Sequence, residues 1–321
     1  MQTARPPRLA ELDAATNLVR QYLPPTPQYC WPLLSQRAGC DVWVKHENHT
    51  PLGAFKMRGG LVFMDWLRRT QPEAAGVVSA TRGNHGQSLG FAARAFGFRA
   101  AVVVPRGNSR EKNAAMRVLR VELLEHGDDF HAADHYADEV CRERGWVRLP
   151  SFDPLLVRGV GTYALELFRG APALSAVFVP IGWGSGACGL AAARNALGLE
   201  TKIIGVVSSA APATARSFEQ GGLTEVAAAT RIADGIAISR PHPEGFRILQ
   251  REIERVVEVS DEEVEEAMRV LFSDTHNAAE GAGAAALAAL LQERARWQGQ
   301  RVGVILSGGN VDRGVFARIM A

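Results

Sequence analysis

Residues 176–189 have the sequence Ala-Val-Phe-Val-Pro-Ile-Gly-Trp-Gly-Ser-Gly-Ala-Cys-Gly. The apolar run at its start is typical of a strand that is buried on both faces of a parallel sheet. The glycines that follow let the backbone approach a ligand closely, and the amphipathic stretch at 186–197 predicts a helix. A strand, a glycine loop and a helix in this order indicate an α/β fold with an anion site at the helix start.

Apolar runs alternate with amphipathic stretches along the rest of the chain. The runs predict buried strands at Asp41–Lys45, Gly76–Ala80, Arg99–Val104, Ala176–Ile181, Lys202–Val207 and Arg301–Leu306. The stretches between them predict helices at Gln87–Phe96, Ser109–Leu119, His131–Arg144 and Gly186–Leu197. A capping box of Ser260 and Glu263 predicts a further helix start ahead of Val264–Phe272. The alternation predicts parallel sheets covered by helices.

Length and composition restrict the possible functions. The 321 residues suffice for about two domains, with the 47% hydrophobic and 22% charged residues of an ordinary globular protein. A net charge of +2 favours neither nucleic acid nor a membrane surface as a partner. No apolar run reaches the ~18 residues that span a bilayer, and the N-terminus lacks a hydrophobic signal core. The four cysteines lack C-x-x-C spacing, so we expect a cytoplasmic protein.

The segment Lys45–Gly60 places Lys56 after a strand and a turn, near the start of a helix. Partial burial and the positive end of a helix both lower the pKa of a lysine and favour its free amine. A free amine attacks an aldehyde to form a Schiff base. Taken alone, the segment is also typical of a surface lysine.

Three other polar or glycine-containing segments follow predicted strands. In Thr81–His85, Asn84 has the donor and the acceptor needed to hold a ring hydroxyl. In Gly182–Gly186, successive backbone N–H groups suit a phosphate, although a nucleotide-binding turn is an alternative despite the G-x-G-x-G spacing. After the last strand, the hydroxyl of Ser307 suits a heterocyclic nitrogen. Each segment alone is also typical of an ordinary turn.

Together the four segments make a stronger case than any one of them. Ligands of doubly wound folds bind at the carboxyl ends of strands, where all four segments lie. An amine, a polar clamp, a phosphate cradle and a partner for a ring nitrogen are what pyridoxal 5′-phosphate requires. The sequence therefore predicts a pyridoxal-phosphate site around Lys56.

These residues resemble the serine/threonine dehydratase group of fold-type II pyridoxal-phosphate enzymes, from about Thr26 to the C-terminus. Five segments match that group in order and spacing: Ala54–Gly59, Gly83–Gln87, Gly159–Thr162, Ala233–Gly235 and Leu306–Asn310. The resemblance implies a tryptophan-synthase-β-like α/β fold with two doubly wound, three-layer domains. The smaller domain, residues 53–155, is expected to be inserted into the larger one, residues 1–52 plus 156–321.

The resemblance also implies roles for individual residues. Lys56 is expected to hold the cofactor and to be the catalytic residue that moves the Cα proton. Cofactor contacts are expected from Phe55, Lys56, Asn84, Gly182, Trp183, Gly184, Ser185, Gly186, Gly235, Glu280 and Ser307. The substrate carboxylate is expected at Thr81, Arg82, Gly83, Asn84 and His85.

Departures from the group narrow these expectations. Ala54 replaces a common serine, and Trp183 and Ser185 interrupt a loop that usually has four glycines. Arg82 stands where serine racemases carry a second catalytic serine. A guanidinium is a poor proton acceptor, which argues against racemisation of that kind, and it suits a substrate carboxylate instead.

Two accessory features of relatives are not expected here. Several relatives bind a divalent cation through acidic residues after the strand matching Lys202–Val207, but Val206–Ala213 contains no carboxylate, so no metal site is expected. The chain ends about ten residues after Asn310, so the C-terminal regulatory domain of biosynthetic threonine deaminases is not expected. A homodimer or larger homo-oligomer is implied by the resemblance.

The leading hypothesis for activity is β-elimination from a β-hydroxy amino acid such as L-threonine or L-serine, which yields a 2-oxo acid and ammonia. Arg82, Ala54 and Trp183 leave open a dehydratase or lyase for another β-substituted amino acid, for example a hydroxy-diamino or hydroxy-acidic one. A nucleotide-dependent oxidoreductase would leave Lys56 and Asn84 without a role. An inactive ligand-binding protein of the same fold is the remaining alternative.

Overall fold

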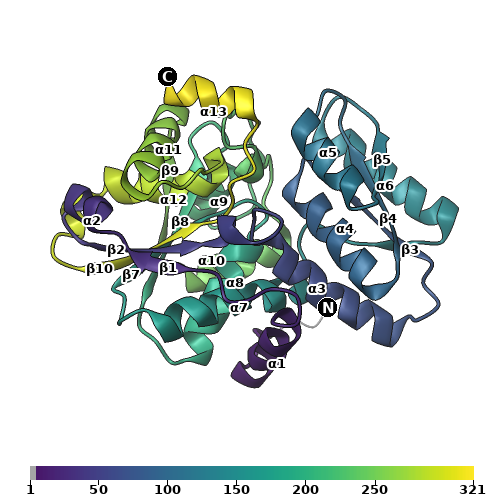
Figure 1. The fold of residues 1–321 in the computed structure, drawn as a ribbon, viewed down its shortest axis with the longest axis horizontal. Helices are drawn as coiled ribbons and strands as arrows, with labels where there is room; N and C mark the ends of the chain where they lie inside the picture. Colours follow the sequence, from purple (N-terminus) through teal and green to yellow (C-terminus); the bar gives the residue numbers. More distant parts are fainter. Residues whose placement is uncertain (1–4) are drawn as a thin grey trace.

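The computed structural model describes residues 5–321 and contains two β-sheets covered by helices (Figure 1). The larger sheet has the strand order β1-β2-β10-β7-β8-β9. β1 is antiparallel to β2, and the other neighbours in this sheet are parallel. The strands are β1 Gln28–Cys30, β2 Asp41–His46, β7 Ala176–Pro180, β8 Lys202–Ser208, β9 Arg255–Val259 and β10 Arg301–Leu306.

The smaller sheet is parallel throughout and has the strand order β5-β4-β3-β6. Its strands are β3 Gly76–Ala80, β4 Arg99–Val104, β5 Glu122–Glu125 and β6 Val147–Arg148. The chain leaves the larger sheet after β2, builds the smaller sheet and returns to the larger sheet at β7. Figure 1 shows the result as two lobes that lie next to each other.

Helices connect the strands and cover the sheets. They are α1 Leu9–Val19, α2 Pro32–Ala38, α3 Lys56–Thr70, α4 Asn84–Phe96, α5 Arg110–Val118, α6 Phe130–Arg144, α7 Pro154–Gly170, α8 Ser185–Ala196, α9 Ala213–Gln220, α10 Pro243–Glu252, α11 Asp261–Thr275, α12 Gly281–Gln292 and α13 Arg313–Met320. Short 3₁₀ turns lie at Glu47–His49, Asp234–Ile236 and Arg294–Arg296.

The strands are apolar on both faces, so both faces of the larger sheet need a helical cover. In β7, Ala176 and Phe178 share a core with residues of α2, α11 and α12. Val177 and Val179, which point to the opposite face, share a core with residues of α7, α8 and α10. This is the three-layer arrangement expected of a doubly wound α/β fold.

The predicted fold class is confirmed, and the six predicted strands occur as β2, β3, β4, β7, β8 and β10 with ends that differ by at most one residue. The capping box is present, because Glu263 N donates to Ser260 Oγ at 3.2 Å and Ser260 N donates to Glu263 Oε2 at 2.7 Å. The predicted start of α4 at Gln87 is wrong. Gln87 N donates to Gly83 O at 3.1 Å, so the first helical turn already contains Asn84.

Glycines allow α3, α7 and α8 to pack closely. A Cβ on Gly159 would lie 2.3 Å from the carbonyl oxygen of Arg58, and a Cβ on Gly189 would lie 2.9 Å from the backbone nitrogen of Gly161. Side chains at these positions would push the helices apart. Through α7, these contacts fix α3, which begins at Lys56, relative to α8, the helix that follows the glycine loop.

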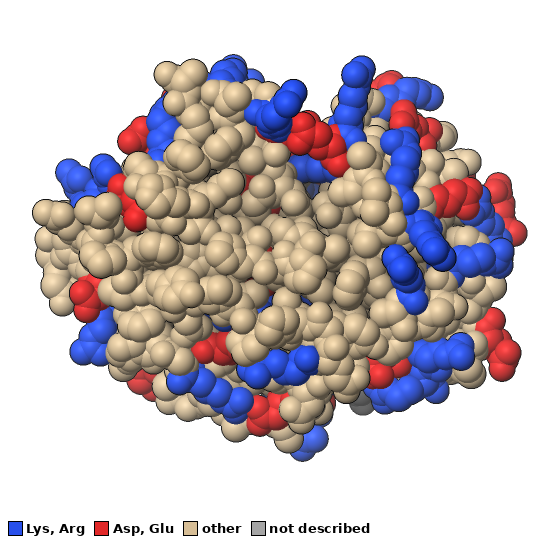
Figure 2. All heavy atoms as spheres, in the orientation of Figure 1, with Lys and Arg blue, Asp and Glu red and all other residues tan. Residues whose placement is uncertain are grey.

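The surface carries charges of both signs. Figure 2 shows basic and acidic side chains interspersed along the outline of one face, whereas the middle of that face contains few charges. No helix within residues 5–321 has both the length and the apolar character needed to cross a lipid bilayer.

Candidate active site

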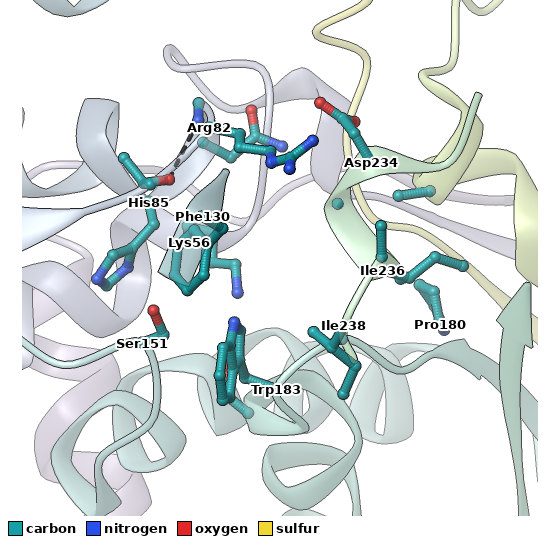
Figure 3. A pocket seen from close by; sticks show the side chains of 18 of the residues that line it. Lys56, Arg82, His85, Phe130, Ser151, Pro180, Trp183, Asp234, Ile236 and Ile238 are labelled. Carbon is teal, nitrogen blue, oxygen red and sulfur yellow. Dashed lines mark hydrogen bonds between the residues drawn. The ribbon is translucent and has the colours of Figure 1, made fainter. Parts of the chain in front are cut away.

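A pocket of about 280 Å³ collects all the residues predicted for the site. They reach it from segments that follow β2, β3, β7 and β10, and from the segments that precede α10 and α12. Figure 3 shows Lys56 inside the pocket, with Arg82, His85, Trp183 and Asp234 around it. The predicted residues that line it are Phe55, Lys56, Thr81, Arg82, Gly83, Asn84, His85, Gly182, Trp183, Gly184, Ser185, Gly186, Gly235, Glu280 and Ser307.

The sequence contains four lysines, and three of them have carboxylate partners. Lys45 Nζ lies 2.7 Å from Glu166, Lys112 Nζ lies 2.7 Å from Asp234, and Lys202 Nζ lies 3.0 Å from Glu254. Within residues 5–321, the Nζ of Lys56 has no hydrogen-bond partner and lies 4.9 Å from the centroid of its neighbour's phenyl ring. Lys56 is therefore the lysine that is free to react in the pocket.

Burial lowers the pKa of Lys56 to about 8, against the opposing effect of the carboxyl group of Glu280. The lowering that the sequence predicted is confirmed in direction, with burial as its main cause. Because an ordinary lysine has a pKa of about 10.4, a much larger share of Lys56 is free amine at neutral pH. This amine suits attack on an aldehyde.

The glycine loop joins β7 to α8 and has the backbone shape of an anion site. Gly184 has a φ of 99°, in the left-handed region that favours glycine. A Cβ on Gly182 would lie 2.7 Å from the carbonyl oxygen of Gly235, so no side chain fits there. The first N–H groups of α8 have no partner within the helix, and the helix dipole adds to their attraction for an anion. The loop therefore suits a phosphate group.

Asn84 and Glu280 form a polar pair that lines the same pocket as the glycine loop. Asn84 Nδ2 donates to Glu280 Oε1 at 2.6 Å, and Asn310 Nδ2 donates to Asn84 Oδ1 at 2.8 Å. Burial raises the pKa of Glu280 to about 7, whereas the charge of Lys112 opposes this. Glu280 Oε2 is buried and has no hydrogen-bond partner among residues 5–321. An unsatisfied buried oxygen that lines a pocket indicates a polar ligand.

Ser307 lies at the same edge of the larger sheet as the glycine loop. Ser307 follows β10, and the glycine loop follows β7. These two strands are parallel neighbours, so their carboxyl ends lie at the same edge of the sheet. Ser307 Oγ makes only a long hydrogen bond of 3.4 Å, to the carbonyl oxygen of Ala282. Its own carbonyl oxygen accepts from Phe55 N at 3.1 Å, so the end of β10 is tied to the start of α3.

The segment Thr81–His85 forms a tight turn between β3 and α4. Gly83 N donates to Thr81 Oγ1 at 3.1 Å. Burial lowers the pKa of His85 to about 3, and the charges of Lys56 and Arg148 add to this, so the imidazole is neutral at pH 7. His85 Nε2 is also buried, and no hydrogen-bond partner for it occurs in the described part of the chain. Arg82 is exposed, and Figure 3 shows its guanidinium on the same side of Lys56 as Asp234.

The pocket also contains residues that the sequence did not predict, among them Lys112, Phe130 and Asp234. Lys112 Nζ lies 2.7 Å from Asp234 Oδ2 and 3.9 Å from Glu280 Oε2. Burial acts to lower the pKa of Lys112, but the two carboxylates raise it overall. Lys112 lies in α5 and Phe130 begins α6, and neither directly follows a strand, so only the tertiary fold brings them to the pocket. Asp234 lies in Ala233–Gly235, which supported the resemblance without giving this residue a role.

Comparison with known proteins supports the same cofactor. Residues 19–308 match the family model described as pyridoxal-phosphate dependent enzyme. The chain is 34% identical over 282 residues to the biosynthetic L-threonine dehydratase of Haemophilus influenzae; the match covers 87% of this chain and 55% of the relative. The chain thus spans about half the length of that relative.

Solved structures show the same fold. The processed form of threonine deaminase isoform 2 from Solanum lycopersicum superposes with a TM-score of 0.90 at 28% identity, over 97% of this chain and 91% of that one. A pyridoxal 5′-phosphate-dependent aspartate racemase superposes with a TM-score of 0.88 at 27% identity, over 95% of this chain and 96% of that one.

The pocket fits the group that these comparisons indicate. Lys56 offers a free amine, the glycine loop offers an anion cradle, and Glu280 offers an unsatisfied oxygen beside Asn84. Within residues 5–321, no cluster of three or more His, Cys, Asp or Glu side chains is arranged to hold a metal ion. The chain belongs to the pyridoxal-phosphate-dependent enzyme family, and pyridoxal 5′-phosphate is its cofactor.

Proposed function

We propose that the protein catalyses β-elimination from a β-hydroxy amino acid, with L-threonine and L-serine as the simplest substrates. The products are a 2-oxo acid and ammonia. The observation that carries the proposal is Lys56, the lysine whose amine is free in a pocket that also holds an anion cradle. The resemblance to threonine dehydratases indicates elimination as the reaction.

Each part of the pocket has a proposed task. Lys56 holds the cofactor and provides the base that takes the Cα proton of the substrate. The N–H groups of Gly182–Gly186 hold the cofactor phosphate, and Asn84 and Glu280 contact the ring hydroxyl side. The turn Thr81–His85 holds the substrate carboxylate. Bound pyridoxal phosphate spreads the negative charge that develops at Cα.

Ser307 favours elimination over a long-lived carbanion. A hydroxyl cannot keep a ring nitrogen protonated as a carboxylate would, so the ring withdraws charge less strongly. The described residues place Ser307, and no Asp or Glu, directly after β10 at this edge of the sheet. A carbanion that is only weakly stabilised loses its β-hydroxyl promptly.

The residue at position 82 argues against racemisation. A racemase needs an acid or base on each face of Cα, and serine racemases supply the second one where this chain has Arg82. A guanidinium remains protonated and is a poor base. His85 is neutral but has a pKa of about 3, lowered mainly by burial, which makes it a weak base as well. One competent base, Lys56, suits elimination.

A second candidate is a lyase that acts on another β-substituted amino acid. Arg82, which lines the pocket and is exposed, suits a hydroxy-acidic substrate because it binds a carboxylate. A hydroxy-diamino substrate is the other possibility within this class. Both reactions use Lys56 in the same way and differ only in what the substrate side chain contacts.

We also propose a homodimer or larger homo-oligomer in the cytoplasm. Tyr29 in β1 is 51% exposed and Leu33 in α2 is 57% exposed. Large exposed apolar side chains mark an interaction surface. Figure 2 shows one face of the molecule whose middle carries few charges. Within each subunit, residues 1–52 plus 156–321 and residues 53–155 act as two domains.

The test is a substrate panel on protein reconstituted with pyridoxal phosphate. We expect release of 2-oxo acid and ammonia from β-hydroxy amino acids, and no release from matched amino acids without a β-leaving group. Interconversion of D- and L-serine without release of oxo acid would favour a racemase. Turnover of neither kind would contradict the proposal.

A further inference from the structure

We propose that Phe130 and Trp183 form a recognition wall that selects a β-hydroxy amino acid with an aryl group on Cβ. This inference rests on the proposed β-elimination and names the substrate class within it. The chemical class is that of β-phenylserine, in which a phenyl ring replaces the methyl group of threonine.

The recognition wall lies on one side of Lys56. The rings of Phe130 and Trp183 are 5.9 Å apart between centroids and tilted by 46°. Ile236 and Ile238, both almost fully buried, line the same pocket. Figure 3 shows the amine of Lys56 directed toward Trp183, with Ile238 on the same side, whereas Arg82 lies on the other side. The side of the pocket that the amine faces is therefore mainly apolar, with the hydroxyl of Ser151 beside Trp183.

Both aromatic side chains are held in place by the backbone around them. Phe130 is the first residue of α6, and the N-cap Asp129 accepts a hydrogen bond from Ala132 N at 2.8 Å. Trp183 lies in the glycine loop, whose neighbouring residue Gly182 has no room for a Cβ. A hydrogen bond of 2.9 Å between His131 Nε2 and Ser239 Oγ joins the start of α6 to the segment that carries Ile238. The wall thus joins the two lobes across the pocket.

The recognition wall offers a larger apolar surface than a methyl group can cover, and much of that surface is aromatic. A methyl group of threonine would touch only a small part of two aromatic rings and an isoleucine. A phenyl group can pack against both rings, and aromatic pairs contribute about 0.5–1.5 kcal/mol beyond the area they bury. Discrimination between apolar groups that differ by one methylene is about 10- to 200-fold. The wall therefore favours the larger, aromatic side chain.

Substrates with a carboxylate or an ammonium on the side chain fit this wall less well. A carboxylate would need Arg82, which Figure 3 places away from Trp183 and Ile238. An ammonium would need a free carboxylate, but Asp234 is paired with Lys112 at 2.7 Å and Asp129 caps α6. Asp129 lines the pocket next to Phe130, but its carboxylate is engaged at the start of α6.

Binding of unreactive analogues separates recognition from catalysis. L-Phenylalanine and L-2-aminobutyrate are β-phenylserine and threonine without the β-hydroxyl, so neither can undergo elimination of water. Their dissociation constants can be measured on the holoenzyme from the change in visible absorbance of the cofactor. We expect L-phenylalanine to bind at least about tenfold more tightly than L-2-aminobutyrate.

A variant of the wall provides the second measurement. Phe130→Ala should weaken L-phenylalanine binding by about 3- to 10-fold, the equivalent of one aromatic contact, and should change L-2-aminobutyrate binding by less than about twofold. Phe272→Ala is the matched control, because Phe272 is 44% exposed and does not line the pocket. The control should leave both dissociation constants unchanged.

Three outcomes would overturn the inference. The first is equal or tighter binding of L-2-aminobutyrate by the wild type. The second is tighter binding of L-aspartate or L-2,4-diaminobutyrate, the unreactive analogues of the hydroxy-acidic and hydroxy-diamino classes. The third is a Phe130→Ala variant that weakens both analogues equally.

Turnover measurements distinguish a failure of this inference from a failure of the proposed reaction. Oxo-acid release from L-threo-β-phenylserine with a higher kcat/KM than from L-threonine supports both. Release from L-threonine with the higher kcat/KM overturns the aryl preference alone. Absence of release from every β-hydroxy amino acid overturns the proposed reaction, and the analogue dissociation constants still decide the recognition wall.

Discussion

Two clusters of buried charged side chains have basic residues that are near neighbours in the sequence, Arg58 and Lys56, but the clusters differ in how their atoms are hydrogen-bonded. In the first cluster, Arg58 donates to both carboxylate oxygens of Glu47 and of Glu166, at distances between 2.8 and 3.0 Å. In the second cluster, Lys56 lacks a hydrogen-bond partner within the described residues, and Glu280 leaves one buried oxygen unpaired. The first cluster is complete without a ligand, whereas the second is not.

The pKa shifts follow the same division. Burial opposes the charge of Arg58, but Glu47 and Glu166 raise its pKa above the usual value. Burial also acts on Glu166, yet Arg58 lowers its pKa overall. At Lys56 and Glu280, burial prevails: the pKa of Lys56 falls to about 8 and that of Glu280 rises to about 7. Buried charged groups whose atoms are all paired indicate a structural role. Buried charged groups with unpaired atoms indicate a ligand-binding role.

The largest expected effect concerns Lys56. Lys56→Ala should lower kcat by on the order of 10³-fold or more, because it removes both the attachment point and the Cα base. The same variant should lose the visible absorbance of the protein-linked cofactor after dialysis. Lys202→Ala is the matched control, since Lys202 is a surface lysine paired with Glu254, and it should retain both properties.

Full turnover by Lys56→Ala would show that another residue attaches the cofactor, and the two clusters would then not differ in the way described. An equal loss of activity in the control Lys202→Ala would also contradict a special role for Lys56.

The next effect tests the paired cluster. Arg58→Met should destabilise the fold by about 3–5 kcal/mol, because it leaves the buried carboxylate of Glu47 without its charged partner and Glu166 with Lys45 as its nearest cation. Glu280→Gln should change the free energy of unfolding by less than about 1 kcal/mol, since that carboxyl already has a raised pKa and an unpaired oxygen. Urea unfolding of both variants, followed by circular dichroism, measures the difference. Equal destabilisation would contradict the division into structural and ligand-binding groups.

A smaller effect follows from the pKa of Lys56. The free amine is the reactive form, and it is lost as the pH falls below the pKa of about 8. The rate at which apoprotein combines with added pyridoxal phosphate should therefore fall about tenfold per pH unit below pH 8 and level off above it. Absorbance after mixing measures this rate, with Lys56→Ala as the baseline. A plateau reached only near pH 10 would indicate an unperturbed lysine.

The sequence predicted the strands that are long and buried. β3, β4 and β7 are continuous apolar runs because both of their faces are covered by helices. It missed the edge strands β1, β5, β6 and β9, which have two to five residues and are less completely buried. Such strands are defined by their neighbours, and a short polar segment gives no signal of its own.

The site was predictable where its residues follow strand ends or match known segments, as Lys56, Asn84 and Ser307 do. Each of these residues lies in a segment that follows a predicted strand, so the position of the strand in the sequence is enough to find it. Phe130 and Lys112 reach the pocket through the packing of the smaller lobe against the larger one. That packing depends on distances between helices, which no local sequence pattern encodes.

We expect Lys56 to hold the cofactor, and because the sequence contains four lysines, the attachment site can be tested directly. Reduction of the holoprotein with borohydride fixes the cofactor on its lysine, and peptide mass mapping then identifies that lysine. We predict the pyridoxyl group on the peptide that contains Lys56 and on none of the peptides that contain Lys45, Lys112 or Lys202. Stoichiometric modification of any of those three, with Lys56 unmodified, would contradict the account.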